Sequence, residues 1–166
     1  MSLSIEPASM ADAAPIAAVQ TRVAAALTRL HGLGHWSTPV TAQSVTRAVL
    51  ASTVLVGRES GEVVATLRLV TKKPWAIDAA CFTRVRRPLY LLSMAIDPAF
   101  QRQGLGRRML DEAAAVTRRW PADAIRLDAY DHRAGAGGFY AKCGYREVGR
   151  ATYRGVPLSY YELRLG

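Results

Sequence analysis

The sequence contains only two cysteines, Cys81 and Cys143, among its 166 residues. Two thiols cannot build a disulfide framework, which excludes a small disulfide-stabilised scaffold. No apolar run approaches the roughly 20 residues that a membrane-spanning helix needs. The opening residues also lack the basic segment and apolar core of a secretory signal. These absences predict a cytoplasmic protein with free thiols and no membrane partner.

Acidic residues are scarce as well. Only 13 Asp and Glu stand against 22 Lys and Arg, which gives a formal net charge of +9. Such an excess suits either an anionic ligand or nucleic acid. The basic residues form no long run with interleaved aromatics, which makes nucleic acid the less favoured partner. Their densest groups are Arg84, Arg86 and Arg87, followed by Arg102, Arg107 and Arg108.

What the chain does contain is the composition of one globular domain. Half of its residues are apolar and 21% are charged, and the length suits a single domain over residues 1–166. The periodicity of the apolar residues predicts a strand–helix–helix start, three further strands, a helix, a strand, a short helix and two closing strands. This order, β-α-α-β-β-β-α-β-α-β-β, predicts an α/β fold with a mixed sheet.

The expected elements have these bounds. A strand over 2–9 is followed by helices over 10–29 and 41–51, the second with Thr41 as its cap. A hairpin joins strands 53–59 and 62–71, and residues 71–88 form a long loop, of the kind that is usually functional or mobile. A central strand (89–97), a helix (104–120), a strand (124–131), a short helix (135–144) and strands 145–152 and 157–165 complete the chain.

The segment "DPAFQRQGLGRRML", residues 97–110, joins the central strand to a helix and places glycines and arginines at the helix start. This pattern indicates a phosphate site. A P-loop is excluded, because Arg107 and Arg108 stand where Lys and Ser or Thr are required. A dinucleotide fingerprint fits poorly, although Asp128 lies at a suitable distance. Met109 occupies the position of the third glycine. The strand also ends well before Gly104, whereas this fingerprint directly follows its strand.

A third kind of phosphate site fits. "QRQGLG", residues 101–106, resembles the Gln/Arg-x-x-Gly-x-Gly/Ala signature of the GNAT superfamily of acetyl-CoA-dependent N-acetyltransferases. "GGFYAKCGYREVG" resembles a second segment of that superfamily, through Phe139, Tyr140, Gly144 and Tyr145. The resemblance is specific from about residue 53 onward and vaguer before it. It implies the GNAT fold, with splayed central strands in a mostly antiparallel sheet, and acetyl-CoA as the acetyl donor. No metal site is expected, because His31 and His35 are spaced like a helical metal pair but Gly32 and Gly34 break the helix there.

The resemblance also implies which residues hold the coenzyme. The main chain of Met94, Ala95 and Ile96 would bind the pantetheine arm and direct an N–H at the thioester oxygen. Many members carry Asn seven residues before the tyrosine; here Arg133 stands there and could bind a phosphate instead. The pyrophosphate would lie at the helix start, against Gln101, Arg102, Gln103, Gly104, Leu105, Gly106 and Arg107.

Two residues are candidates for the chemistry. Tyr140 matches the tyrosine that protonates or stabilises the departing thiolate in many members; its alternative role is to anchor the short helix. Asp128 matches an acidic residue that acts as general base in some relatives, and burial beside Leu127 and Ala129 would raise its pKa. Asp128 could instead orient the substrate or pair with Arg126 or Arg133, and a water chain could serve as the base.

The acceptor itself is not encoded in any motif. The first helices and the 71–88 loop would build its site, with Trp36 and Trp75 packing against the acceptor and Asp78 attracting its amine, or all three could be structural. The expected function is acetyl transfer to a small-molecule amine or a peptide N-terminus, by direct attack in a ternary complex. A non-catalytic acyl-CoA-binding module and a basic nucleic-acid-binding domain are the alternatives, and superfamily resemblance also allows a homodimer.

Overall fold

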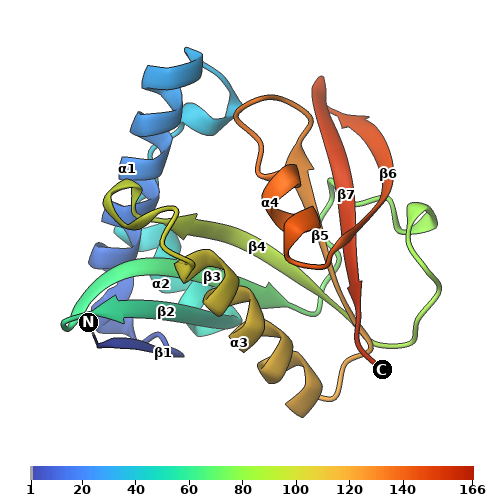
Figure 1. The fold of residues 1–166 in the computed structure, drawn as a ribbon, viewed down its shortest axis with the longest axis horizontal. Coiled ribbons are helices and arrows are strands. Elements are labelled where there is room, and N and C mark those ends of the chain that lie inside the picture. Colours follow the sequence, from blue (N-terminus) through green and yellow to red (C-terminus); the bar gives the residue numbers. More distant parts are fainter. Residues whose placement is uncertain (1) are drawn as a thin grey trace. The chain divides into compact units, whose positions relative to one another are not determined.

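The computed structural model describes residues 2–166 (Figure 1). Its seven strands form one mixed sheet in the order β1-β2-β3-β4-β5-β7-β6, as the α/β prediction requires. The strands are β1 (Leu3–Pro7), β2 (Thr53–Glu59), β3 (Glu62–Val70), β4 (Pro88–Ile96), β5 (Ala124–Tyr130), β6 (Arg146–Tyr153) and β7 (Val156–Arg164). The helices are α1 (Ala13–His31), α2 (Ala42–Ala51), α3 (Leu105–Arg119) and α4 (Gly137–Lys142).

The chain divides into two compact units. Unit 1 comprises the chain up to Leu69 together with Leu92–Ala113, and unit 2 comprises Val70–Leu91 and Ala114–Gly166. The elements β4 and α3 therefore each contribute residues to both units. A single domain over residues 1–166 stays a prediction.

The strands of unit 1 are antiparallel, with β1 paired to β2 and β2 paired to β3. The β2–β3 hairpin turns at Ser60 and Gly61, whose φ values of +51° and +86° suit a two-residue hairpin turn. The ladder shifts at Gly57. A Cβ there would lie 3.1 Å from the Ala65 Cβ and from the Met109 sulfur, so glycine lets α3 approach β2 closely.

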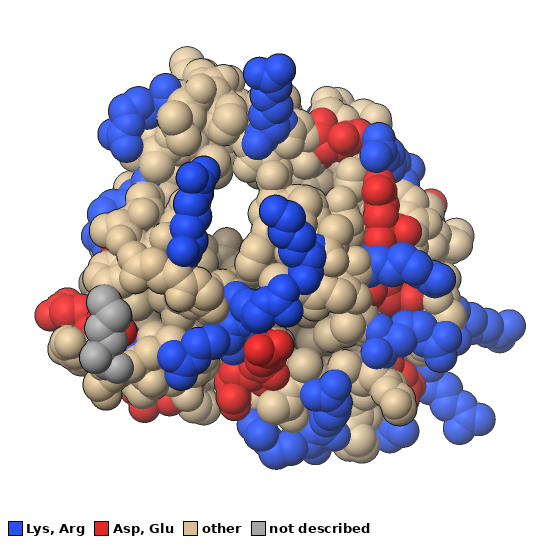
Figure 2. Space-filling model, in the orientation of Figure 1, with Lys and Arg blue, Asp and Glu red and all other residues tan. Residues whose placement is uncertain are grey.

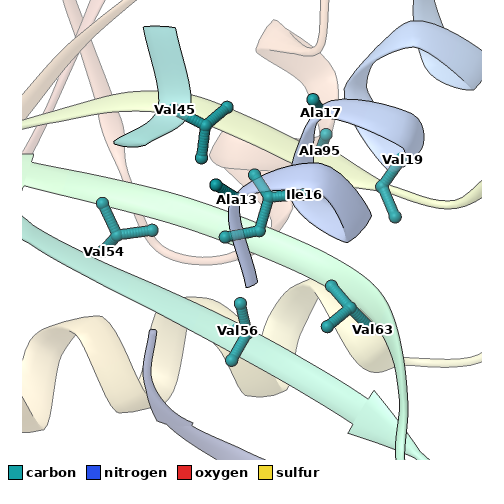
Figure 3. Close-up of a cluster of buried hydrophobic side chains, with 9 residues drawn as sticks. All are labelled: Ala13, Ile16, Ala17, Val19, Val45, Val54, Val56, Val63 and Ala95. Carbon is teal, nitrogen blue, oxygen red and sulfur yellow. The ribbon is translucent and has the colours of Figure 1, made fainter. Parts of the chain in front are cut away.

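Apolar side chains of α1 and α2 pack on one face of this sheet (Figure 3). Ile16 and Val19 of α1 and Val56 of β2 are at most 1% exposed. Alternate strand residues face opposite sides, so Val56 meets the helices while its neighbour Gly57 faces α3. Thr41 caps α2 as predicted, since its hydroxyl accepts a hydrogen bond from the Ser44 amide at 3.2 Å.

The first long helix differs from its expected bounds of 10–29. A 3₁₀ turn, Met10–Asp12, precedes it, and α1 itself runs from Ala13 to His31. The Asp12 carboxylate accepts a hydrogen bond from the Ser9 amide at 2.8 Å, which fixes the entry to the helix. Gly32, at φ +80°, ends it. Among residues 2–166, no helix is long and apolar enough to cross a membrane.

In unit 2, β5 lies between β4 and β7. It pairs antiparallel with β7 along its whole length, from Ala124 to Tyr130. Its parallel ladder with β4 is short and sets Pro88, Leu89 and Tyr90 opposite residues 124–126. The strands β6 and β7 form the closing hairpin that the sequence predicts.

The 71–88 segment is a loop as predicted, apart from a 3₁₀ turn at Ala79–Cys81 and the strand start at Pro88. Ile77 and Phe82 are buried in a core cluster with Tyr90, Leu158 and Tyr160. The Tyr160 hydroxyl donates to the Ala76 carbonyl and accepts from the Asp78 amide. The loop is therefore part of the core of unit 2.

Candidate active site

In unit 1, Asp97 organises the end of β4. Its amide donates to the Val64 carbonyl at 2.8 Å, which continues the sheet by one residue. One carboxylate oxygen accepts from Arg22 of α1 at 2.6 Å. The other accepts from the Ala99 amide at 3.0 Å and caps the 3₁₀ turn at Pro98–Phe100. A buried carboxylate thus fixes the direction in which the chain leaves the strand.

The predicted phosphate site, residues 101–107, follows this turn. The Gln101 side chain donates to the Ile96 carbonyl at 3.0 Å and the Gln103 side chain to the Ala99 carbonyl at 3.4 Å. Both amides thus shape the segment itself. Arg102 and Gly104 have positive φ, +61° and +80°. A Cβ on Gly104 would meet no atom within 4 Å, so glycine is needed there for its backbone conformation, and the space beside it is open.

The segment leads into the N-terminus of α3. Leu105 is 7% exposed and anchors the first turn, whereas Gly106 is half-buried and Arg107 is exposed. The first amides of a helix have no intrahelical partner and carry a partial positive charge. Figure 2 shows Lys and Arg side chains over the start of α3. Open space, helix amides and nearby guanidinium groups fit a pyrophosphate.

The strand segment Met94–Ile96 has a conformational break just before it. Ser93 is exposed at φ +53°, in the left-handed region that non-glycine residues rarely adopt. Gln20 of α1 donates to the Ser93 carbonyl at 3.2 Å. Its buried Oε1 atom has no hydrogen-bond partner among residues 2–166. Ala95 packs in the core cluster of Figure 3. The ladder of β4 with β5 covers only Pro88, Leu89 and Tyr90, so it does not include the segment Met94–Ile96.

In unit 2, Tyr140 lies on α4 and is 7% exposed. Its ring contacts Phe139, Tyr145 and Tyr161, with centroid distances of 5.3, 5.7 and 6.1 Å. A Cβ on Gly137 would collide with the Tyr161 hydroxyl, so this glycine allows α4 to pack against β7. A Cβ on Gly135 would likewise collide with the Tyr130 carbonyl. These glycines thus serve close packing within unit 2.

Burial raises the pKa of both candidate catalytic groups, Asp128 and Tyr140. Desolvation raises the pKa of the Asp128 carboxyl above its ordinary value. Desolvation also raises the pKa of the Tyr140 hydroxyl, and the negative charges of Asp128 and Cys143 add to this shift. Asp128 and Tyr140 therefore interact electrostatically. The tyrosine keeps its proton at neutral pH, as a proton donor must, whereas the carboxyl is a stronger base than an exposed aspartate.

The raised pKa of Asp128 predicts a stabilising substitution. The folded protein holds this proton more tightly than the unfolded chain, whose carboxyl titrates near 3.8. Burying the ionised carboxylate destabilises the folded state. This loss of stability is absent below pH 3.8, grows as the pH rises, and is complete above the pKa of Asp128 in the folded protein. Asp128→Asn should therefore melt at a higher temperature than wild type at neutral pH, and the difference should shrink in acid. Melting curves across pH test this, with exposed Asp131→Asn as control; a variant less stable at neutral pH would contradict it.

Arg126 does not pair with Asp128. It donates from Nε to Glu162 at 3.2 Å, from Nη2 to the Thr83 carbonyl at 2.6 Å and from Nη1 to the Tyr90 hydroxyl at 3.3 Å. Arg126 and Glu162 are 5% and 3% exposed. This buried ion pair holds the 71–88 loop on the sheet of unit 2. Sequence reasoning missed the role, although an arginine inside the apolar strand "AIRLDAY" was its signal.

The residues predicted to bind the acceptor, and Arg133, differ in exposure and in hydrogen bonding. Trp75 is 82% exposed, and Arg133 is exposed. The Asp78 carboxylate caps the 3₁₀ turn by accepting from the Ala80 amide at 3.0 Å. Trp36, in unit 1, donates to the Gly32 carbonyl at 3.0 Å and packs edge-on against His31. No cluster of three or more metal-ligating side chains occurs in residues 2–166.

Comparison with known proteins identifies the family. The family model described as "Acetyltransferase (GNAT) family" matches residues 29–145. The chain therefore belongs to the GNAT acetyltransferase family, and the resemblance seen in the sequence is confirmed. A search of curated protein sequences finds no match.

Solved structures share the fold. A ribosomal-protein-alanine N-acetyltransferase from Brucella melitensis is 19% identical, with a TM-score of 0.75 over 98% of this chain and 99% of that one. The yncA protein of Salmonella typhimurium, solved with acetyl-CoA, is 20% identical, with a TM-score of 0.72 over 100% and 95%. The PaiA N-acetyltransferase of Thermoplasma acidophilum, solved with coenzyme A, is 15% identical, with a TM-score of 0.72 over 99% and 100%. These likenesses confirm the predicted GNAT fold.

Proposed function

We propose that this protein is an N-acetyltransferase that moves the acetyl group of acetyl-CoA to a primary amine by direct attack in a ternary complex. The observation that carries the proposal is the start of α3, where Gly104 at φ +80° leaves open space beside helix amides and arginines. Family membership and two structural neighbours solved with acetyl-CoA or coenzyme A support the same ligand.

We assign the coenzyme-binding residues from the resemblance to the GNAT superfamily and from the geometry of the α3 start. The α3 amides from Leu105 to Arg107, with the Arg102 side chain, would bind the pyrophosphate. The main chain of Met94–Ile96 would bind the pantetheine arm, and one of its N–H groups would polarise the thioester carbonyl. Arg133, exposed in unit 2, is assigned to a coenzyme phosphate in place of the usual asparagine. Gln101 and Gln103 act by shaping the loop.

Acetyl-CoA supplies the acetyl group as a thioester. The neutral amine forms the new C–N bond while the C–S bond breaks, so one proton must leave the nitrogen and one must reach the sulfur. Asp128 takes the amine proton, directly or through water, because its raised pKa makes it a better base. Burial raises the pKa of the Tyr140 hydroxyl and keeps it protonated. The hydroxyl therefore donates a hydrogen bond to the departing thiolate, which takes the proton as the C–S bond breaks.

The acceptor is a small-molecule amine or a peptide N-terminus. Structural neighbours include enzymes named for both kinds of acceptor, a ribosomal-protein-alanine N-acetyltransferase and a phosphinothricin N-acetyltransferase. Of the three candidate acceptor residues we favour Trp75, because its side chain is 82% exposed, whereas the Asp78 carboxylate caps a 3₁₀ turn and the Trp36 indole donates to the Gly32 carbonyl. Cys81 and Cys143 are half-buried and form no disulfide, which suits a cytoplasmic location.

A thiol-release assay tests the proposal. Wild-type protein is mixed with acetyl-CoA and a panel of polyamines, amino acids, aminoglycosides and peptides with free or blocked N-termini. Release of coenzyme A thiol with at least one free amine, and not with its blocked counterpart, is expected. Tight acetyl-CoA binding with no release above the hydrolytic background for any amine would instead indicate a non-catalytic acyl-CoA-binding module.

A further inference from the structure

The positive charge of the protein is concentrated in one unit. Unit 2 holds 14 of the 22 Lys and Arg residues but only 6 of the 13 Asp and Glu residues, so its formal charge is +8 and that of unit 1 is +1. The segment assigned to pyrophosphate lies in unit 1. Binding the coenzyme pyrophosphate therefore leaves most of the excess charge unexplained.

Hydrogen bonds of the backbone bring arginines from three segments of unit 2 together. Asp123 joins them, since its amide donates to the Arg87 carbonyl at 2.8 Å and its carbonyl accepts from the Leu165 amide at 2.9 Å. Arg164, just before Leu165, lies opposite Ala124 in the β5–β7 ladder. Arg118 lies five residues before Asp123, at the end of α3. We name this set, with neighbouring Arg84 and Arg86, the arginine cluster: Arg84, Arg86, Arg87, Arg118 and Arg164.

The arginine cluster is exposed, and its side chains form no ion pairs within residues 2–166. The Asp123 carboxylate accepts a hydrogen bond from the Arg87 backbone amide at 2.9 Å and, within the described residues, is not paired with a guanidinium group. By contrast, Arg126 and Arg150 of the same unit have carboxylate partners. Figure 2 shows Lys and Arg side chains gathered over the C-terminal end of α3.

An aromatic ring accompanies the arginines. Trp120 directly follows the last turn of α3, and 43% of it is exposed. Its amide donates to the Val116 and Thr117 carbonyls at 3.1 and 3.2 Å, so the residue is fixed at the helix end beside Arg118. Guanidinium groups bind phosphates through paired donors, and an exposed indole offers a stacking surface for an unpaired base. An acidic peptide would use the arginines but not the ring.

We infer that the arginine cluster and Trp120, none of which is assigned to acetyl-CoA, form a binding surface for single-stranded nucleic acid. The arginines neutralise successive phosphates, and Trp120 stacks on a base. The surface requires neither acetyl-CoA nor acetyl transfer, so this inference and the proposed function stand or fail separately. The sequence does not predict this surface, because its arginines come from three separate segments. The β5–β7 ladder and the hydrogen bonds of Asp123 bring these segments together in the fold.

Fluorescence anisotropy with labelled oligo-uridylate and oligo-thymidylate tests the inference, with a duplex and an oligo-glutamate peptide as comparison ligands. Single strands should bind in a salt-dependent manner, with log K falling by about 0.7 per tenfold rise in salt for each phosphate neutralised. Arg86→Gln/Arg118→Gln should lower this slope by about 1.4 and the affinity about tenfold at low salt. Trp120→Ala should weaken single-strand binding about fivefold or more, through loss of one stack.

The matched control is Arg29→Gln/Arg47→Gln, which removes the same charge from exposed positions of unit 1. It should leave binding nearly unchanged, and melting curves should show that all variants fold. Equal loss in both double variants would mean that net charge alone drives binding. That result, a preference for the duplex or the acidic peptide, or no binding of single strands at low salt would each overturn the inference.

Discussion

Tyr140→Phe is expected to lower kcat about 10²- to 10⁴-fold, the usual contribution of a positioned proton donor. Acetyl-CoA affinity should change little, because the substitution removes one oxygen and keeps the ring contacts with Phe139, Tyr145 and Tyr161. Burial and the nearby Asp128 raise the pKa of the hydroxyl, so the proton stays available through the neutral range. Steady-state kinetics with the acceptor identified by thiol release give kcat and KM separately.

The matched control is Tyr161→Phe. Tyr161 is as buried as Tyr140, at 7% exposed, and its hydroxyl pKa is also raised by burial. It lies on β7 and contacts the Tyr140 ring, so any loss of packing should appear in both variants. A kcat for Tyr140→Phe that equals that of Tyr161→Phe would show that Tyr140 anchors α4 and has no part in proton transfer.

Arg126→Leu is expected to lower the free energy of unfolding by about 3–5 kcal/mol, the usual cost of leaving one partner of a buried ion pair alone. Glu162 would remain 3% exposed without its cation. The Thr83 carbonyl and the Tyr90 hydroxyl would lose their donors as well. Chemical denaturation of wild type and variant measures the difference.

Two further variants distinguish the ion pair from other effects. Arg126→Leu/Glu162→Leu should recover much of the loss, because an apolar pair avoids the buried charge. Arg150→Leu removes a 2.6 Å ion pair with Glu147 whose side chains are 64% and 37% exposed, and should change stability little. A double variant no more stable than Arg126→Leu would show that the hydrogen bonds to the 71–88 loop, rather than the charge pair, carry the stability.

The sequence predicted those features of the fold that depend on local patterns. The apolar periods of residues 53–71 and 104–120 predicted the β2–β3 hairpin and α3, and Thr41 predicted the cap of α2. The start of α1 was placed too early. The Asp12 carboxylate accepts hydrogen bonds from the Ser9 amide and from Arg58 of β2, and the Asp12 amide donates to the Ser9 carbonyl. These contacts favour a 3₁₀ turn, which an apolar period does not encode.

Long-range pairing limited what could be predicted of the site. The glycine pattern located the start of α3, but the support that Arg22 gives to Asp97 spans 75 positions in the chain. The Arg126–Glu162 pair depends on the β5–β7 register. Gly135 and Gly137 are required because their Cβ positions would collide with Tyr130 and Tyr161. Such contacts follow from strand pairing and helix packing, which residue spacing alone does not specify.

Calorimetric titration of acetyl-CoA into wild type and Gly104→Glu tests the central claim most directly. The glutamate would place a negative charge beside the α3 amides, in space that is open in the structure. The matched control is Gly61→Glu, which adds the same charge at a similar φ, +86°, in the β2–β3 turn. Saturable binding by wild type and Gly61→Glu, and none by a folded Gly104→Glu, is the predicted result. No binding by folded wild type, or equal binding by all three, would contradict the assignment of this segment to acetyl-CoA.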